Sequence, residues 1–543
     1  MLLLFALAVL AVDITASLYL TNVEPDDGKI YSQIAKNVVA YGVFSTDLQQ
    51  PIAPTIIRLP GYPLFLAGIY SIFGVGNDSA VHFVQGLLLF GAAVLAGLIA
   101  WNWASGKRRR RRSAGVCTFF LTGLCPFTLN YSGVLLTETA TMFLMAAMTL
   151  TATYAIKAAS GRTSVLWWAI AGLAAGLAVE FRPDSGMFAL GLGLTLVIAA
   201  FVRSSFRGAL TDALLKGAIF SLVFLLVMTP WAIRNYRVFD QFQPLAPSHA
   251  EMPGEFVPHG YFLWLRTWIT DIKYVSPMLW DLEQKPIAMK SIPDSAFSND
   301  EEKTRVAALL EQYNNSDPDH PMKSDGKPAE SNDDQDDDSS DKGADDEDDS
   351  GSEDKSDEAS ANSDENTDEE WDLKISPEAD AAFEQIARER ITNRPLHFYV
   401  ELPAIRASNM WFDTHSEYYA FAGELFPIKD LDSETYQNLW LPLFAGIVWA
   451  YTILAVAGLL TLLIAGWPRG WLWAAMVLLL TVPRIVFLGM LENPEPRYLV
   501  GYFMFAAILG GVALSRVGLR CGGGRLSLSL LYGRERNGRV RNR

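Results

Sequence analysis

Two adjacent carboxylates, Asp26 and Asp27, directly follow the first apolar segment of the chain. Arg58 comes later in the same polar stretch, immediately before a Leu-Pro-Gly-Tyr-Pro turn. An arginine holds an anion through charge-assisted hydrogen bonds, and a carboxylate can take a proton from a hydroxyl or an amine. Residues of these types suit a reaction in which an anionic group is held while a proton is moved.

Charged residues of both signs recur at the edges of other apolar segments. Ionisable groups at membrane depth are costly and usually face the protein interior or a wet cavity. Beyond the first polar stretch these residues are Glu138, Arg182, Asp184, Arg234, Glu492, Glu495 and Arg497. Several have an alternative, structural interpretation: helix capping for Asp26 and Glu138, a turn for Arg182, and snorkelling to lipid headgroups for Arg234 and Arg497.

The composition indicates a polytopic membrane protein. Half of the 543 residues are hydrophobic, with 15 Trp and 30 Phe. The net charge of −16 comes from one stretch, because residues 325–370 contain 22 acidic residues and 3 lysines. Without that stretch, the chain contains 41 basic and 38 acidic residues. We therefore expect membrane lipid, and no nucleic acid, among the partners.

Apolar runs predict an all-α protein with about ten transmembrane helices, each about 20 residues long. They are residues 1–20, 80–104, 115–132, 136–156, 164–181, 185–202, 213–230, 439–465, 471–490 and 498–515. Residues 1–20 could alternatively be a signal peptide, but they contain no basic n-region and no convincing small-residue cleavage site. The basic stretches, such as Lys107 to Arg112, all fall on one side of this arrangement, which identifies that side as cytoplasmic.

This topology divides the chain into four parts. Residues 1–235 form an N-terminal transmembrane core whose first outer loop, 21–79, carries amphipathic helices over Lys29 to Ala40 and Leu64 to Phe73. Residues 236–438 form a large, mixed extracytoplasmic loop. Its acidic segment, 314–370, has too few apolar residues to fold and is predicted to be disordered. Residues 439–515 return to the membrane, and 516–543 form a basic cytoplasmic tail.

The first loop resembles that of the C-type (GT-C) polytopic glycosyltransferases. The matching residues are Asp27-Gly-Lys-Ile-Tyr31-Ser-Gln-Ile-Ala35-Lys-Asn37, Phe44-Ser45, Arg58-Leu-Pro-Gly-Tyr-Pro-Leu-Phe-Leu66 and Gln85. Leu136-Thr-Glu138, Arg182-Pro183, Pro230-Trp-Ala-Ile-Arg-Asn-Tyr236 and Glu495-Pro-Arg-Tyr498 follow in the same order. The chain is most similar to the bacterial relatives of protein O-mannosyltransferases (glycosyltransferase family 39) and of lipid A aminoarabinose transferase.

The resemblance implies a hexosyl- or pentosyltransferase that takes a sugar from a dolichyl- or undecaprenyl-phosphate carrier at the outer face of the bacterial inner membrane. It implies catalytic roles for Asp27, with Asp26 second, and for Glu138 as a helper. It implies phosphate-binding roles for Arg58, Arg234 and Arg497. Tyr31, Tyr62, Arg182, Glu495 and Tyr498 are expected to line the same site. The acidic segment departs from the family pattern.

The chemistry of these residue types agrees with that function. A phosphate leaving group is already a stable anion, so arginines can hold it without a strong acid. One carboxylate can take the proton of the acceptor, and inversion at the sugar carbon is expected because no second carboxylate is clearly placed as a nucleophile. The sequence identifies no cofactor, and a divalent metal shared by Asp27 and Glu138 stays open. The sequence does not identify the acceptor, whether lipid, glycan or protein.

Two other functions use the same residues. A transporter or flippase for a lipid-linked or small solute would use the charges as a translocation path, but it predicts charges in mid-span and repeated halves. A non-catalytic scaffold would use the acidic segment to bind a partner. The three cysteines, Cys117, Cys125 and Cys521, and the six scattered histidines have no metal-ligand spacing.

Overall fold

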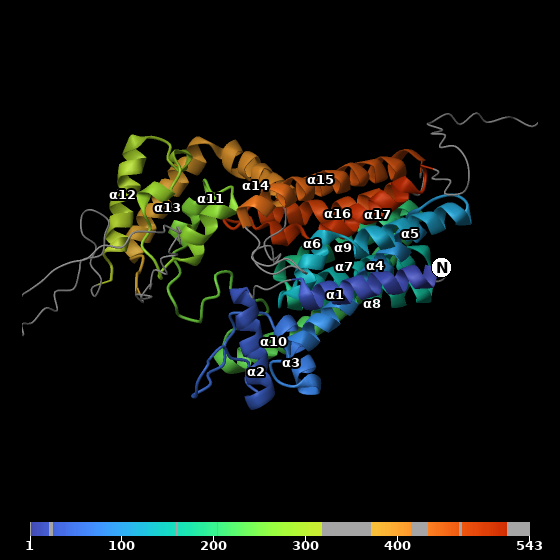
Figure 1. Cartoon of the computed structure of the whole chain (residues 1–543), viewed down its shortest axis with the longest axis horizontal. Coiled ribbons are helices and arrows are strands. Elements are labelled where there is room, and N and C mark those ends of the chain that lie inside the picture. Colours follow the sequence, from blue (N-terminus) through green and yellow to red (C-terminus); the bar gives the residue numbers. More distant parts are fainter. Residues whose placement is uncertain are drawn as a thin grey trace, which may run out of the picture. The chain divides into compact units, whose positions relative to one another are not determined.

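The computed structural model describes residues 2–20, 25–158, 161–203, 205–317, 371–413, 433–465 and 470–517. All regular elements in these ranges are helices and none is a strand, which confirms the predicted all-α class (Figure 1). Most of the acidic segment 314–370 and of the basic tail lies outside the described residues. The chain forms two compact units: Met1–Val257 with Tyr399–Arg543, called here the membrane unit, and Pro258–Phe398, called the small unit.

Among the residues that the structure describes, seven helices of the membrane unit are long and apolar enough to cross a membrane. They are α4 (Asp78–Trp103), α7 (Glu138–Lys157), α8 (Gly161–Phe181), α9 (Gly186–Arg203) with η2 (Pro183–Ser185) before it, α10 (Phe206–Phe239), α15 (Ser433–Leu460) and α16 (Gly470–Gly489). A further pair, in which α5 (Arg108–Gly123) is followed by α6 (Pro126–Asn130) and η1 (Tyr131–Gly133), is apolar enough when taken together and is bent by 48°; it makes eight spans if it is counted as one broken span rather than a re-entrant loop. These elements correspond to eight of the ten predicted spans.

The first and last predicted spans are shorter than expected. Residues 1–20 correspond to α1 (Leu2–Tyr19), and 498–515 to α17 (Tyr502–Leu514), which has only 13 residues. The last span is shortened at its start, because Pro496 opens a separate 3-10 turn, η9 (Pro496–Leu499), instead of the helix. That turn carries Arg497 and Tyr498.

The spans pack through small residues and expose apolar ones. A Cβ atom on Gly97 of α4 would lie 2.9 Å from the Gly115 carbonyl oxygen of α5, and the reverse distance is the same, so both positions need glycine for the helices to touch. Elsewhere on the bundle, Leu222, Leu225 and Leu226 of α10 are more than half exposed. Such a surface is suited to lipid, and the chain is a multi-pass membrane protein.

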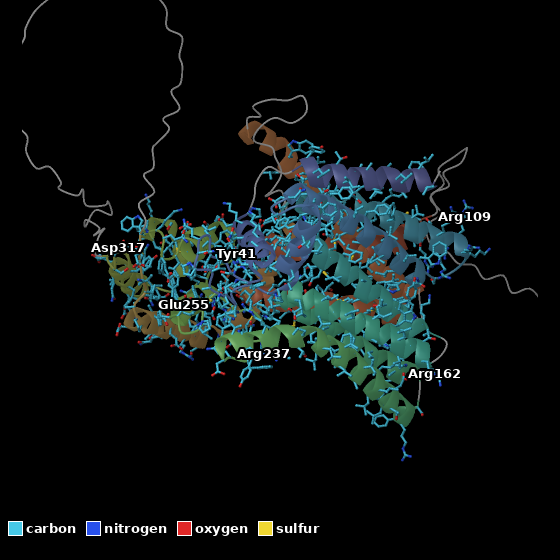
Figure 2. All side chains as sticks on the ribbon, turned by 90° about the horizontal axis from the view of Figure 1, so that it is seen from below. Tyr41, Arg109, Arg162, Arg237, Glu255 and Asp317 are labelled. Carbon is cyan, nitrogen blue, oxygen red and sulfur yellow. The ribbon has the colours of Figure 1, made fainter. Side chains whose placement is uncertain are left out.

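Opposite ends of the membrane unit carry different groups (Figure 2). Arg109, from the basic run before the third span, and Arg162 lie at one end of the helix bundle. Tyr41, Arg237 and Glu255 lie toward the other end. The first loop therefore lies away from the basic loops, as the charge distribution predicts.

The first loop folds into two helices, α2 (Asp26–Tyr41) and α3 (Gly61–Phe73), which pack against each other. Ile34 and Ala35 of α2 are fully buried, so the predicted amphipathic helix is present. It begins at Asp26, three residues before its predicted start, because Pro25 precedes it in an extended conformation and the two acidic residues suit a helix N-terminus.

The small unit has its own aromatic core. Its main helices are α11 (His259–Arg266), α12 (Asp300–Asn314) and α13 (Pro377–Asn393), the last beginning at the predicted residue. The Phe383 ring of α13 lies 5.1 Å from the Tyr261 ring and 5.2 Å from the Trp264 ring, between centroids. Short turns complete the unit: η3 (Ile272–Tyr274), η4 (Ser276–Trp280), η5 (Met289–Ser291) and η6 (Asp294–Ala296). Three elements remain: η7 (His397–Glu401), α14 (Leu402–Phe412) and η8 (Thr461–Ala465).

Candidate active site

Asp27 lies in the first turn of α2, where its carboxylate meets two arginines. Its Oδ1 accepts a hydrogen bond from Arg58 Nη2 at 2.8 Å, and its Oδ2 accepts one from Arg497 Nη2 at 3.1 Å. Arg58 precedes α3, and Arg497 lies in η9, so three separate segments meet at this carboxylate. The Asp27 side chain is 27% exposed, which leaves it accessible to a bound molecule.

Asp26 does not join this group. Its side chain is 92% exposed and pairs with Lys29, one helical turn later, at 2.9 Å. An exposed pair of this kind contributes about 0–1 kcal/mol to stability. The sequence kept both acids as candidate catalytic residues, and the structure separates them by placing only Asp27 between arginines.

Arg497, which bonds to Asp27, also pairs with a second acid, Glu495. The Glu495 carboxylate is 2% exposed and forms an ion pair with Arg497, with Oε1 3.2 Å from Nη2. The same carboxylate accepts hydrogen bonds from the Tyr498 hydroxyl and from Asn493 Nδ2. Arg497 is therefore fixed between Glu495 and Asp27, and its guanidinium cannot turn away without losing one of them.

A second row of charges lies in the break between α8 and α9. Arg182 Nη1 donates to Glu138 Oε1 at 2.6 Å, and Arg182 Nε donates to Asp184 Oδ1 at 3.3 Å. Asp184 Oδ2 also accepts from Arg484 Nε of α16 at 2.9 Å. All four side chains are largely buried. Charges of alternating sign thus run from α16 across the break to the start of α7.

Pro183 explains why this break occurs. The residue before a proline is driven out of the helical region, and Arg182 is extended, with φ −147° and ψ 122°. The helix α8 consequently ends at Phe181, and α9 starts anew at Gly186. Because of this break, Arg182 lies between two spans and not within one, where its side chain pairs with Glu138 and Asp184.

Tyr498 joins the two rows. Its ring lies 4.9 Å from the Arg182 guanidinium carbon, its hydroxyl bonds to Glu495, and its carbonyl accepts a hydrogen bond from Arg484 Nη1 at 2.8 Å. We call the joined set the arginine–carboxylate cluster. It contains Asp27, Glu138, Asp184, Glu495, Arg58, Arg182, Arg484 and Arg497. Its formal charges cancel, so an anion that enters competes with the carboxylates for the arginines.

Gly61 brings two parts of the cluster together. A Cβ atom at this position would lie 2.5 Å from the Glu180 carbonyl carbon and oxygen, which no side chain could tolerate. The start of α3 therefore contacts the end of α8 directly. This contact places the segment that carries Arg58 beside the break that carries Arg182.

The two predicted tyrosines of the first loop differ in their roles. Tyr31 lies one turn after Asp27, and burial together with the Asp27 charge raises the pKa of its hydroxyl to about 12 although three arginines oppose the rise. Tyr62 is fully buried, with its ring 5.2 Å from that of Tyr31 and its hydroxyl donating to Gln85 Oε1 at 2.9 Å. Tyr62 therefore supports Tyr31 by ring packing.

Arg234 forms a separate positive group. Its Nη1 donates to the Thr55 carbonyl at 2.8 Å, and its guanidinium carbon lies 4.9 Å from the centroid of the Trp231 ring. In the part of the chain that the structure describes, no carboxylate pairs with it. Arg234 therefore ties α10 to the first loop and retains an uncompensated charge, but it does not join the arginine–carboxylate cluster.

The charges determine the ionisation of the cluster. Burial alone would raise the pKa of Asp27, but Arg497 and Arg58 hold it below its usual value. Burial would lower the pKa of Arg497, yet Glu495 and its other neighbours hold it well above the ordinary value. Asp184 and Glu138 likewise raise the pKa of Arg182 against its burial. Asp27, Arg182 and Arg497 are therefore ionised at neutral pH.

The surroundings of the acids favour anions over a divalent metal. Both oxygens of Asp27 face guanidinium groups, and Glu138 faces Arg182. Among the residues that the structure describes, no three His, Cys, Asp or Glu side chains converge on a possible metal position.

Sequence reasoning missed Arg484 as a site residue and noted Asp184 only as a charge at the outer face. The signal for Arg484 is present in the sequence, since it is an arginine beside Pro483 within an apolar span. A charge in such a position requires a buried partner. The partner is 300 residues earlier in the chain, which no local pattern reveals.

Three solved structures are similar to the chain. Two are crystal structures of ArnT from Cupriavidus metallidurans, one bound to undecaprenyl phosphate and one in the apo state. They are 14% and 16% identical, cover 95% of this chain and 78% and 77% of ArnT, and give TM-scores of 0.38 and 0.37.

The third is the archaeal oligosaccharyltransferase AglB from Archaeoglobus fulgidus, in complex with an inhibitory peptide and a dolichol-phosphate. It is 14% identical, covers 97% of this chain and 53% of AglB, and gives a TM-score of 0.45. The chain thus spans about half the length of AglB. No protein-family model and no curated protein sequence matches the chain.

Proposed function

We propose that the chain is a membrane glycosyltransferase that moves a sugar from a polyprenyl-phosphate carrier to an acceptor at the extracytoplasmic face of a bacterial inner membrane. The observation that carries this proposal is the Asp27 carboxylate held between Arg58 and Arg497. It combines a partly exposed proton acceptor with two groups that bind phosphate. The basic loops lie at the other end of the bundle, which favours the extracytoplasmic side for the site.

The donor phosphate competes with Asp27 for the same two arginines. Arginine hydrogen bonds to phosphate are charge-assisted and frequently bidentate, so Arg58 and Arg497 can transfer their donors from the carboxylate to the phosphate. Glu495 keeps Arg497 in place during this exchange. The lipid phosphate then occupies a site that was preformed and electrically neutral.

This exchange also activates Asp27. In the structure as it stands, both oxygens of Asp27 are occupied and its pKa is held low, which makes it a poor proton acceptor. When the arginines turn to the phosphate, the pKa of Asp27 rises toward its ordinary value and its oxygens become free. Donor binding thereby prepares the base for the acceptor.

In the transfer step, the acceptor hydroxyl or amine gives its proton to Asp27 and bonds to the sugar carbon. The bond from that carbon to the phosphate oxygen breaks, and the polyprenyl phosphate leaves as an anion held by Arg58 and Arg497. One displacement of this kind inverts the configuration at the sugar carbon. Arg182, neutralised by Glu138 and Asp184, positions Tyr498 below the site and is not required for proton transfer.

Arg234 receives a separate role in this proposal. Its charge is not compensated by a described carboxylate, and it lies against the first loop. A long-chain phosphate that approaches the first loop is attracted to this charge before it reaches the cluster. Glu138 supports the base only indirectly, through its pairing with Arg182.

The test compares Asp27→Asn with Asp26→Asn in cells that otherwise lack the gene. Mass spectrometry of the membrane lipids measures carrier-linked sugars, and the envelope fraction is searched for the missing glycosylated product. Loss of a general base lowers the rate by about 10²–10⁴-fold, so Asp27→Asn should accumulate the same carrier-linked sugar as the deletion. Asp26→Asn, an exposed control of identical chemistry, should restore the wild-type pattern.

Two results would contradict the proposal. Unchanged transfer by Asp27→Asn would remove the proposed base. Movement of a carrier-linked sugar across the membrane by the purified protein, without transfer to any acceptor, would identify a flippase instead.

A further inference from the structure

The small unit contains a cavity of about 560 Å³ that the transfer reaction does not use. Its volume lies within the range of about 300–1,000 Å³ that is usual for small-molecule sites. The wall consists of two arginines, a histidine, hydroxyl and amide groups, and the rings of two phenylalanines. These residues are Thr267, Ser295, Phe297, Ser298, Arg390, Ile391, Asn393, Arg394, His397 and Phe398. None of them is acidic.

Two acids near this cavity are already paired, one with Arg390 of the wall and one with a lysine outside it. Glu302 forms an ion pair with Arg390 at 2.7 Å, and Asp294 forms one with Lys303, also at 2.7 Å. Arg394, which directly follows α13, is exposed and has no ion pair or side-chain hydrogen bond among the described residues. Its positive charge is therefore not compensated within the described part of the wall.

Arg390 forms a rigid part of the wall. Its side chain is 12% exposed, and its Nη1 donates to Glu302 Oε1 at 2.7 Å, to the Ala296 carbonyl at 2.7 Å and to Ser298 Oγ at 3.2 Å. All of these hydrogen bonds use the same nitrogen. Nε and Nη2 retain their donors, with no partner among the described residues. The guanidinium is thus held in place while part of its hydrogen-bonding capacity is still available.

The polar groups beside the arginines suit a hydroxylated molecule. The Ser298 hydroxyl accepts a bond from Arg390, so its own proton can be donated to a ligand. Ser295 and Asn393 add further polar groups, and Phe297 and Phe398 offer apolar surface against which a carbon ring can pack. Sites of this kind combine apolar walls with a few polar groups that fix the orientation of the ligand.

We propose that this cavity binds a phosphate group carried by a hydroxyl-bearing molecule, with Arg390 and Arg394 as the phosphate contacts. Arginine is the residue that best matches the geometry of phosphate. Two guanidinium groups and the neighbouring hydroxyls supply more hydrogen-bond donors than the two oxygens of a carboxylate ligand can accept. A phosphate ligand has three strong acceptor oxygens and matches these donors better. The site does not depend on the proposed transferase activity, because all of its residues belong to the small unit.

The test uses the purified full-length chain in nanodiscs of phosphatidylcholine. Isothermal titration calorimetry measures the binding of glucose 6-phosphate, inorganic phosphate and glucose. We expect saturable binding of glucose 6-phosphate at millimolar concentration or below, weaker binding of inorganic phosphate and none of glucose. Failure of both phosphate compounds to bind the wild-type chain would overturn the proposal.

Two arginine variants locate the binding. Arg394→Gln should weaken the binding of glucose 6-phosphate by at least about tenfold, because it removes a charged phosphate contact. Arg388→Gln is the control, since Arg388 lies in the same segment but is 71% exposed, pairs with Glu384 and does not line the cavity. An equal loss in both variants, or none in Arg394→Gln, would show that the cavity is not the site.

Two further measurements distinguish the sources of the ligand and separate this site from the active site. If nanodiscs that contain phosphatidylglycerol suppress the binding of glucose 6-phosphate, the phosphate comes from a lipid headgroup; unchanged binding indicates a soluble sugar phosphate. Asp27→Asn should leave this binding intact whatever its effect on sugar transfer. Loss of binding in Asp27→Asn would contradict a separate site in the small unit.

Discussion

Replacing Asp184 by asparagine removes the negative charge that Arg182 and Arg484 share. The Asp184 side chain is 7% exposed, and its two oxygens accept hydrogen bonds from both guanidinium groups. Breaking a buried ion pair from one side costs about 3–5 kcal/mol, because the remaining charge is left without compensation. Arg182 keeps Glu138, so the main loss is at Arg484, whose closest charged partner disappears.

This loss of folding free energy can be converted into an expected shift of the melting temperature, Tm. The membrane unit has roughly 400 residues, and an unfolding entropy of about 2.1 cal/mol/K per residue gives a shift of about 1.2 °C per kcal/mol. Asp184→Asn should therefore lower the Tm by about 4–6 °C. Intrinsic fluorescence of the tryptophans, followed on heating the protein in detergent, measures this shift.

The control is the same substitution at Asp212, a half-exposed residue that pairs with Lys216 one turn away on α10. Helical pairs of this type contribute about 0.3–0.5 kcal/mol, so Asp212→Asn should change the Tm by less than about 1 °C. Combining Asp184→Asn with Arg484→Gln should cost less than the sum of the single changes, because the two groups are coupled. Equal shifts for the two asparagine variants would refute the assignment of Asp184 as a buried, shared counter-ion.

Two other changes test the first loop. Gly61→Ala places a methyl group 2.5 Å from the Glu180 carbonyl and should destabilise the protein by about 1–3 kcal/mol or more, whereas Gly68→Ala, on the same helix with open space around it, should be close to neutral; thermal denaturation compares them. Because its arginines hold the pKa of Asp27 below its ordinary value of 3.8, the ionised carboxylate stabilises the fold above that value, and this contribution is lost as the pH falls through the folded-state pKa. The Tm difference between wild type and Asp27→Asn should accordingly be constant above about pH 5 and should shrink below about pH 4, and a difference that grows on acidification would contradict the ion pairs.

The helical spans could be predicted from the sequence because lipid imposes a length and an apolar composition on each. Pro25 and Pro183 also indicate where helices begin and end, and both positions are breaks in the structure. The topology predicted that Asp27, Arg58 and Arg497 lie on one face of the membrane, together with Asp26 and Arg234, but their direct contact is seen only in the structure. Their chemical roles remain predictions.

The sequence could not separate neighbours or identify buried partners. Asp26 and Asp27 differ by one position, and successive helical residues point in directions about 100° apart, so which of the two faces the arginines depends on how α2 packs. Arg484 was missed, because its partner Asp184 lies in another helix pair, 300 residues earlier in the chain. Arg234, like Arg497, is an arginine at the outer edge of an apolar segment. In the described part of the chain, however, its neighbours are aromatic rings and carbonyl groups rather than acids.

The neutrality of the arginine–carboxylate cluster limits how the site can work. A site with free arginines would bind any anion that reached it, and its base would be independent of the donor. Here each arginine of the cluster already has a carboxylate partner, so a phosphate gains only the difference between its own hydrogen bonds and those that it replaces. The Asp27 position is the weakest point of this arrangement, because Asp27 is more exposed than Glu138, Asp184 or Glu495 and its bond to Arg497 is long. Exchange with a phosphate is consequently easiest at the one carboxylate that has to be released to accept a proton.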